Sequence, residues 1–116
     1  MNLIETVREK LEEIEPVVFY GMAGNVREGD MWNYIVFFRE HRRPSENRTG
    51  KTYIFHVAIV RENEIPDGLD DEVIAKILEI PGVRVAGDAS YTYVEKQNTG
   101  AVVEVMDIPF SKAMKV

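Results

Sequence analysis

Cysteine is absent from this chain of 116 residues, and histidine occurs only at His41 and His56. The absence of cysteine excludes disulfide bonds and thiolate chemistry. The two histidines have no HxxH or HExxH spacing, so they do not predict a zinc site. No apolar run approaches the ~20 residues of a membrane-spanning helix. The acidic, amphipathic start is also unlike a signal peptide.

Motifs for catalysis and cofactor binding are missing as well. The acidic segment from Asp67 to Glu72 lacks the spacing of a calcium-binding loop, and helix capping explains it better than the weaker alternative, a casually bound divalent cation. The glycines at Gly21 and Gly24 follow an expected strand but match no phosphate-binding loop. No serine lies in a G-x-S-x-G turn. The sequence therefore predicts a protein that is not an enzyme and has no metal or cofactor.

Charge is plentiful but unevenly placed along the chain. The net charge is −6 and the pI is about 4.9, which argues against a free duplex-DNA binder. The acidic region comprises Asp67, Asp70, Asp71, Glu72 and Glu79, together with Glu62 and Glu64. The basic region, diluted by Glu40 and Glu46, comprises Arg39, Arg42, Arg43, Arg48 and Lys51. Two such surfaces can pair between copies of the chain, and the alternative is that both are simply solvated.

Hydrophobic periodicity predicts one α+β domain over residues 1–116. The expected elements are a helix over 3–15, strands over 17–20, 31–39 and 52–61, a helix over 69–80, a return to strand from Val83, and strands over 88–96 and 101–108. The order α-β-β-β-α-β-β predicts a two-layer sandwich of about five mainly antiparallel strands with both helices on one face. The second helix is expected to carry the chain across the sheet.

Several local features sharpen this expectation. Asn2 and Glu5 form a capping pair for the first helix, and Asp67 or Asp70 is expected to cap the second. The first strands should be antiparallel. The strand over 31–39 is apolar on both faces, so a helix or a partner subunit should cover each face. Residues 40–51 read as a mobile hairpin loop, Pro109 as a strand end or edge, and residues 111–116 as a frayed tail.

The order of these elements resembles a known protein family. An amphipathic helix precedes V-x-F-Y-G, the aromatic strand MWNYIVFFR and a polar loop. The strand YIFHVAIVREN-x-IP, a helix, IPGVR, YTYVEK and VVEVMDIPFSK follow. Over essentially the whole chain, this pattern is similar to the tail-terminator, or tail-completion, proteins of long-tailed bacteriophages and prophages.

That resemblance implies a structural role in head–tail joining. Such proteins form a ring, typically hexameric, that caps the tail tube, joins it to the head connector and leaves an axial channel for DNA. The implied partners are other copies of the chain and the tail-tube and connector proteins, with no sequence-specific nucleic acid binding and no membrane. The implied location is the virion tail or neck, after assembly in the host cytoplasm. Arg39, Arg42, Arg43, Arg48 and Lys51 would then contact neighbouring subunits.

Two other classes remain open from the sequence. One is a different phage neck or minor structural protein. The other is a small ferredoxin-like enzyme or ligand-binding domain with a site on the open face of its sheet. A deep polar pocket in a monomer would favour the latter, whereas a flat surface completed by further copies would favour a structural protein.

Overall fold

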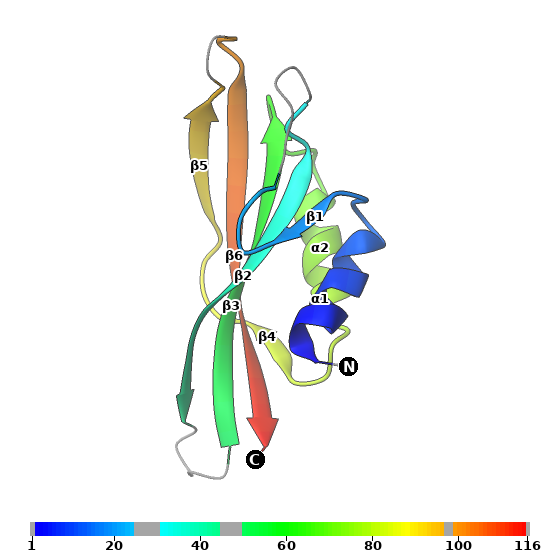
Figure 1. Cartoon of the computed structure of the whole chain (residues 1–116), viewed down its shortest axis with the longest axis vertical. Helices are drawn as coiled ribbons and strands as arrows, with labels where there is room; N and C mark the ends of the chain where they lie inside the picture. The colour runs from blue at the N-terminus through cyan, green and yellow to red at the C-terminus, as the bar shows by residue number, and fades with distance from the viewer. Residues whose placement is uncertain (1, 25–30, 45–49, 97–98, 116) are drawn as a thin grey trace.

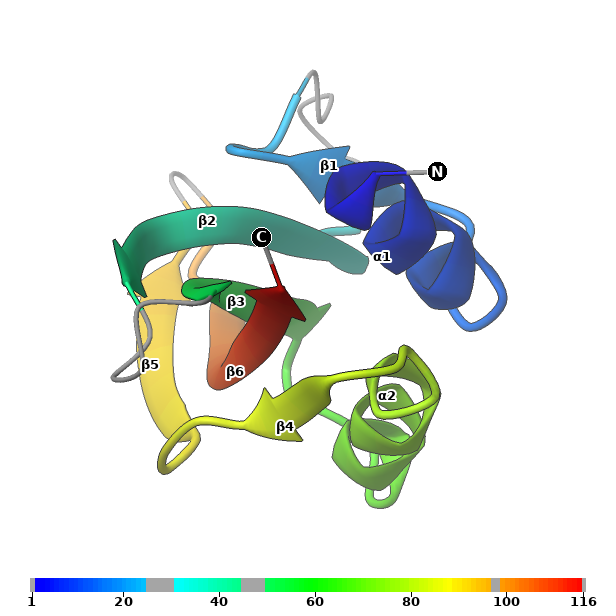
Figure 2. The same ribbon diagram turned by 90° about the horizontal axis from the view of Figure 1, so that it is seen from below.

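The computed structural model describes residues 2–24, 31–44, 50–96 and 99–115 and contains two helices and one six-stranded sheet (Figure 1). The elements are α1 (Leu3–Glu12), β1 (Val18–Tyr20), β2 (Tyr34–Pro44), β3 (Gly50–Glu62), α2 (Leu69–Ile77), β4 (Val83–Val85), β5 (Ser90–Glu95) and β6 (Val102–Lys115). Both helices lie on the same side of the sheet (Figure 2). The predicted α+β architecture is therefore confirmed.

The centre of the sheet is the antiparallel pair β3 and β6. The two strands are paired along all thirteen residues of β3, from Gly50 opposite Lys115 to Glu62 opposite Val103. On its other side β6 pairs with β5 and then with β4, one after the other along its length. Because β3 and β4 are both antiparallel to β6, they run in the same direction, and α2 carries the chain between them as expected.

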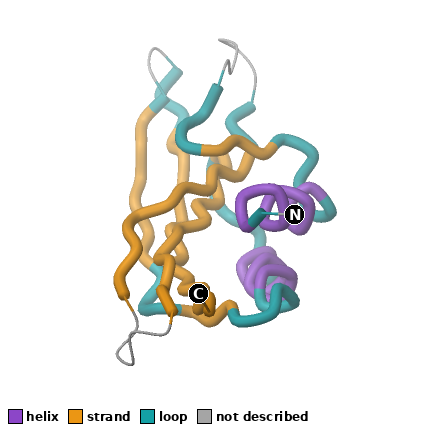
Figure 3. Tube along the Cα trace, turned by 60° about the horizontal axis from the view of Figure 1, so that its bottom comes forward, coloured by secondary structure: helices purple, strands orange, loops and turns teal. Residues whose placement is uncertain are grey.

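The main hydrophobic core fills the space between the helices and one face of the sheet. Alternation along β3 directs Phe55, Val57 and Ile59 toward the helices, where all three are buried. Phe55 and Phe110 stack across the β3–β6 pair with ring centroids 5.5 Å apart. The helices lie next to each other over this face (Figure 3). Two ion pairs join them, Lys10–Glu79 at 2.8 Å and Lys76–Glu13 at 3.3 Å.

The opposite face of the sheet is covered in part by the chain itself. Tyr34, Val36, Val60 and Val103 form a second buried cluster. Phe19, Ala23 and Trp32, from the segments before β2, pack against this cluster. No helix is needed there, because these neighbouring side chains remove the apolar surface of β2 from water.

The hairpin between β2 and β3 differs from the sequence-based expectation. Residues 40–44 and 50–51, expected to be loop, continue the two strands in an antiparallel ladder that reaches Pro44 and Lys51. Only residues 45–49 of the expected loop remain outside the described residues. Residues 40–44 are exposed on both faces of the strand, so their side chains show no alternation of apolar and polar residues that would predict a strand. Backbone hydrogen bonds to β3 extend the strand through this charged stretch.

The carboxyl-terminal residues are also a strand and not a frayed tail. Residues 111–115 pair with β3, and Phe110, Ser111 and Lys112 pair with β4. Pro109 lies inside β6, opposite His56. The Ala86 N–H donates to the Pro109 carbonyl at 2.9 Å, so the Pro109 backbone faces the gap between β4 and β5. The missing proline N–H therefore costs the β3–β6 ladder no hydrogen bond.

Two smaller expectations are corrected at the helices and the first strand. β1 pairs with β2 in parallel, because α1 and the loop after Tyr20 bring β2 back alongside it in the same direction. The α2 helix begins after Gly68, whose φ of 91° favours glycine, and no aspartate side chain caps it. For α1 the cap is as expected, since the Glu5 N–H donates to Asn2 Oδ1 at 2.9 Å.

We predict that Phe110→Ala destabilises the fold by about 3–5 kcal/mol, since it removes the ring that stacks on Phe55 and leaves a cavity between β6 and the helices. Val94→Ala, at an exposed position of β5, is the matched control and should change stability by less than about 0.5 kcal/mol. Urea unfolding followed by circular dichroism measures both. Similar losses in the two variants would contradict the placement of the core.

Candidate functional site

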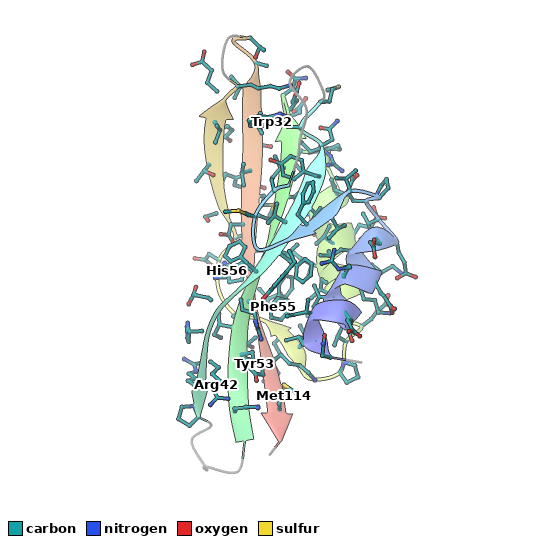
Figure 4. All side chains as sticks on the ribbon, viewed as in Figure 1. Trp32, Arg42, Tyr53, Phe55, His56 and Met114 are labelled. Atoms are coloured by element: carbon teal, nitrogen blue, oxygen red, sulfur yellow. The ribbon has the colours of Figure 1, made fainter. Side chains whose placement is uncertain are left out.

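Basic side chains from four strands gather at the end of the sheet that carries the β2–β3 hairpin. We call this set the basic end; it comprises Arg39, Arg42 and Arg43 of β2, Lys51 of β3, Arg84 of β4 and Lys112 of β6. Arg42 is opposite Tyr53, which in turn is opposite Lys112, so these three residues form one row across the sheet. Figure 4 shows Arg42, Tyr53 and Met114 at this end of the molecule.

The sequence anticipated only part of the basic end. Arg39, Arg42, Arg43 and Lys51 were expected from their proximity in the chain, and the structure brings them to the paired ends of β2 and β3. Arg84 and Lys112 were missed, because they arrive through the pairing of β4 with β6 and have no local motif. Arg48 is outside the described residues.

A bulge in β2 decides which face each arginine occupies. The register shifts between Arg39, opposite Phe55, and His41, opposite Ile54, so Glu40 is the extra residue. Arg39 and Arg42 are three positions apart and would lie on opposite faces of a regular strand. The bulge places both on the helix side, whereas Arg43, opposite Thr52, lies on the other face.

The cations of the basic end have no acidic partners among the described residues. Every ion pair of a described lysine or arginine lies elsewhere: Lys10–Glu79, Arg61–Glu15, Lys76 with Glu13 and Glu79, and Lys96–Glu62. Contacts at the basic end are instead to neutral groups, such as Arg39 Nε to the Tyr20 hydroxyl at 3.0 Å and Lys112 to the Pro81 carbonyl. Among the described residues, a protein of net charge −6 thus keeps a group of positive charges without acidic partners at one end.

Tyr53 lies within this positive environment. The Lys51 ammonium is 5.4 Å from the centre of the Tyr53 ring, a distance suited to a cation–π contact. Hydrogen bonding with Lys51 and then with Arg42 lowers the pKa of the Tyr53 hydroxyl, because both cations favour its ionised form. The tyrosine therefore reports the positive potential of the basic end.

A pocket of about 480 Å³ opens beside the basic end, between α1, the α2–β4 connection and the helix-side face of the sheet. Its apolar lining comes from Leu3, Ile4, Ile80, Pro81 and Met114. Arg39, Tyr53 and Lys112 line it from the sheet, and Asn2 and Thr6 line it from α1. It therefore combines an apolar wall with positive charge.

On the other face of the sheet, His56 lies between two carboxylates. Its Nδ1 is 2.6 Å from Asp107 Oδ1 and its Nε2 is 2.5 Å from Glu40 Oε1. Phe38 stacks on the imidazole with ring centroids 5.1 Å apart. The group joins β2, β3 and β6 and holds the bulge residue Glu40 in place. We call His56, Asp107 and Glu40 the His56 clamp. Figure 4 shows His56 and Phe55 directed to opposite faces of β3.

Electrostatics in the His56 clamp favour a protonated imidazole. Burial lowers the pKa of His56, but the hydrogen bonds with Asp107 and Glu40 outweigh it, and the net pKa is raised above the ordinary value of 6.5. The bond with His56 likewise lowers the pKa of Glu40. A doubly paired imidazolium is poorly placed to ligate a metal, and within the described residues no group of three or more histidine, cysteine or acidic side chains could hold one.

The acidic region is concentrated at the start of α2. Asp70, Asp71 and Glu72 occupy the first turn, where the helix dipole favours negative charge. These three and Asp67 form no ion pair with a described residue. The start of α2 follows the Glu62 end of β3, whereas the basic end is at its Gly50 end (Figure 1). Opposite charges are thus separated along a molecule with extents of 52 × 25 × 25 Å.

Comparison with known proteins yields no match to any family model and no curated protein similar to this chain. Over the described residues, no helix is long and apolar enough to cross a membrane.

We predict that the His56 clamp makes stability depend on pH. Because the folded-state pKa of His56 is raised, the protonated clamp contributes its full stability below about pH 6.5, the unfolded value, and loses it as the pH rises through the folded value. The unfolding free energy should fall over that interval, and Asp107→Asn should lower the pKa of His56. Urea unfolding at several pH values and an NMR titration of His56 measure the two effects. A folded-state pKa below 6.5 would contradict the clamp.

Proposed function

We propose that this chain, which resembles a tail terminator, is a structural subunit of a phage tail. Copies of it would form a ring, with six as the expected number, that caps the tail tube and joins it to the head connector. The resemblance of its element order to that family supports the proposal, as does an architecture that separates a basic end from the acidic start of α2. The ring would be part of the virion tail or neck and would be assembled in the host cytoplasm.

The observation that carries this proposal is the separation of uncompensated charges. The basic end lies at the β2–β3 hairpin, whereas the first turn of α2 lies beside the sheet away from that end (Figure 1), and no ion pair joins the two sets of described residues. Between copies they are complementary, and a contact between different surfaces of identical subunits is heterologous. Heterologous contacts close into rings when the rotation between subunits allows it.

Strand β5 offers a further contact surface. All six of its residues are exposed, including Tyr91 at 51% and Tyr93 at 63% exposure. The strand pairs only with β6, so the backbone groups of its outer edge have no strand partner among the described residues. Natural proteins usually protect such edges, and an exposed aromatic edge is typical of a surface that meets another chain. This edge would contact a neighbouring subunit or the tail-tube protein.

No catalytic role is proposed for any residue. The His56 imidazole is held between two carboxylates as a structural clamp. Arg39, Arg42, Arg43, Arg48 and Lys51 are proposed interface residues, and DNA would pass through the ring without sequence-specific contacts. A small ligand-binding domain is the second candidate function, and the pocket beside the basic end is the observation that favours it.

The test is whether the chain assembles, alone or with its proposed partners. Light scattering and native mass spectrometry should show a ring-forming oligomer at high concentration or after addition of tail-tube protein. We predict that Arg42→Ala, Arg43→Ala and Arg48→Ala together weaken assembly at least roughly tenfold, the equivalent of ~1.4 kcal/mol, while the thermal midpoint changes little. A strict monomer that binds neither tail-tube nor connector protein would refute the proposal.

Two further variants separate a specific contact from a change in net charge. Lys10→Ala with Lys76→Ala removes two positive charges from the helices and should leave assembly intact, unlike Arg42→Ala with Arg43→Ala. Charge reversal at Asp70 and Asp71 should abolish self-assembly, and mixing that protein with a charge-reversed Arg42 and Arg43 variant should restore mixed oligomers. If mixing restores nothing, α2 is not the partner of the basic end.

A further inference from the structure

The pocket beside the basic end has the composition of a ligand site. Its volume of about 480 Å³ falls within the range of roughly 300–1,000 Å³ typical of small-molecule pockets. Aliphatic side chains from α1, from the α2–β4 connection and from β6 form most of its wall. Ile80 is buried beneath it, and Leu3, Ile4 and Met114 are half-buried. An apolar body of a ligand would be removed from water on several sides.

The polar side of the pocket is positive. Arg39 donates through Nε to the Tyr20 hydroxyl at 3.0 Å, which fixes its guanidinium beside the pocket and leaves its terminal N–H groups without a described partner. Lys112 donates to the Pro81 carbonyl on the opposite side. Arg42 and Lys51 add positive potential through Tyr53, which also lines the pocket. Of these cations, Arg39 of β2 and Lys112 of β6 line the cavity itself.

No described lining residue offsets this charge, because none of the described residues that line the pocket is acidic. The Glu5 carboxylate contacts a lining residue, since its Oε1 is 3.5 Å from Asn2 Nδ2. A neutral apolar ligand would leave the charges of Arg39 and Lys112 beside it without a counter-charge, and a cation would be repelled. An anion with an apolar body satisfies both sides of the pocket.

We propose that this pocket binds an organic monoanion, in which a carboxylate is attached to an apolar chain or ring. The carboxylate accepts hydrogen bonds from the terminal nitrogens of Arg39, a geometry that suits a planar carboxylate, and Lys112 contributes a second positive charge. The apolar body lies against Leu3, Ile4, Ile80 and Met114. This inference does not require ring formation, because every residue it uses comes from one copy, and Arg39 is the one residue that it shares with the proposed interface.

Decanoate, held below its micelle-forming concentration, is the probe. Isothermal titration calorimetry should show one site per chain, and NMR shifts should be centred on the pocket residues. Decanol and decyltrimethylammonium have the same apolar chain with no charge and with a positive charge, and both should bind at least tenfold more weakly. Equal binding of all three would overturn the proposal and indicate only adventitious contact with apolar surface.

Matched variants assign the charge to Arg39. Arg39→Ala should weaken decanoate binding at least tenfold. Tyr20→Phe removes the hydrogen bond that positions Arg39 but keeps the cation, so it should weaken decanoate binding less than Arg39→Ala does. Arg43→Ala is the matched control: it removes a cation of the same sheet end from the opposite face and should bind decanoate like the unaltered protein. If Arg43→Ala costs as much as Arg39→Ala, the effect is general charge and the site is refuted.

A third variant tests the cavity itself. Met114→Trp fills the pocket without changing charge and should abolish decanoate binding while the unfolding midpoint stays within a few degrees. Unchanged binding in this variant would overturn the assignment. Assembly is measured separately on the same protein, so loss of decanoate binding with intact oligomers, or the reverse, distinguishes the pocket from the ring contact.

Discussion

The pairing of β3 with β6 is the interaction on which the rest of the structure depends. It runs the full length of β3 and contains the Phe55–Phe110 stack at its centre. β2 attaches to one side of this pair, and β4 and β5 attach to the other. The helices then cover the face from which the buried rings project. Because the ladder continues beyond the core, it also carries Lys51 and Lys112 to a shared end of the molecule.

The bulge at Glu40 links the scaffold to its functional surface. A bulge inserts a residue and reverses which face each later side chain occupies. In β2 it groups Arg39 and Arg42 beside the pocket and sends Arg43 to the other face. The His56 clamp holds the bulge through Glu40 and ties it to Asp107 on β6. A structural histidine thus determines where the cations point, although it contacts none of the proposed partners itself.

Uncompensated cations in an acidic protein are the common basis of both proposals. Like charges held together at one end repel each other, so an anionic partner bound at that end would reduce the electrostatic repulsion that remains in the folded protein. The two proposals use this potential differently. The ring contact draws on the exposed arginines at the hairpin, whereas the pocket draws on Arg39 and Lys112 next to apolar side chains. The ring contact would bind the surface of another protein subunit, and the pocket would bind a small molecule.

The sequence by itself determined the elements whose signal is local. Helical spacing marked the buried face of α1, alternation marked the two faces of β3, and the element order implied helices on one side of a sheet. Only the tertiary structure decided the parallel β1, the strands that continue through charged residues, and the meeting of Arg39, Tyr53 and Lys112 around one pocket. These features depend on hydrogen bonds and register between segments far apart in the chain, and the hydrophobic periodicity within a short segment does not predict them.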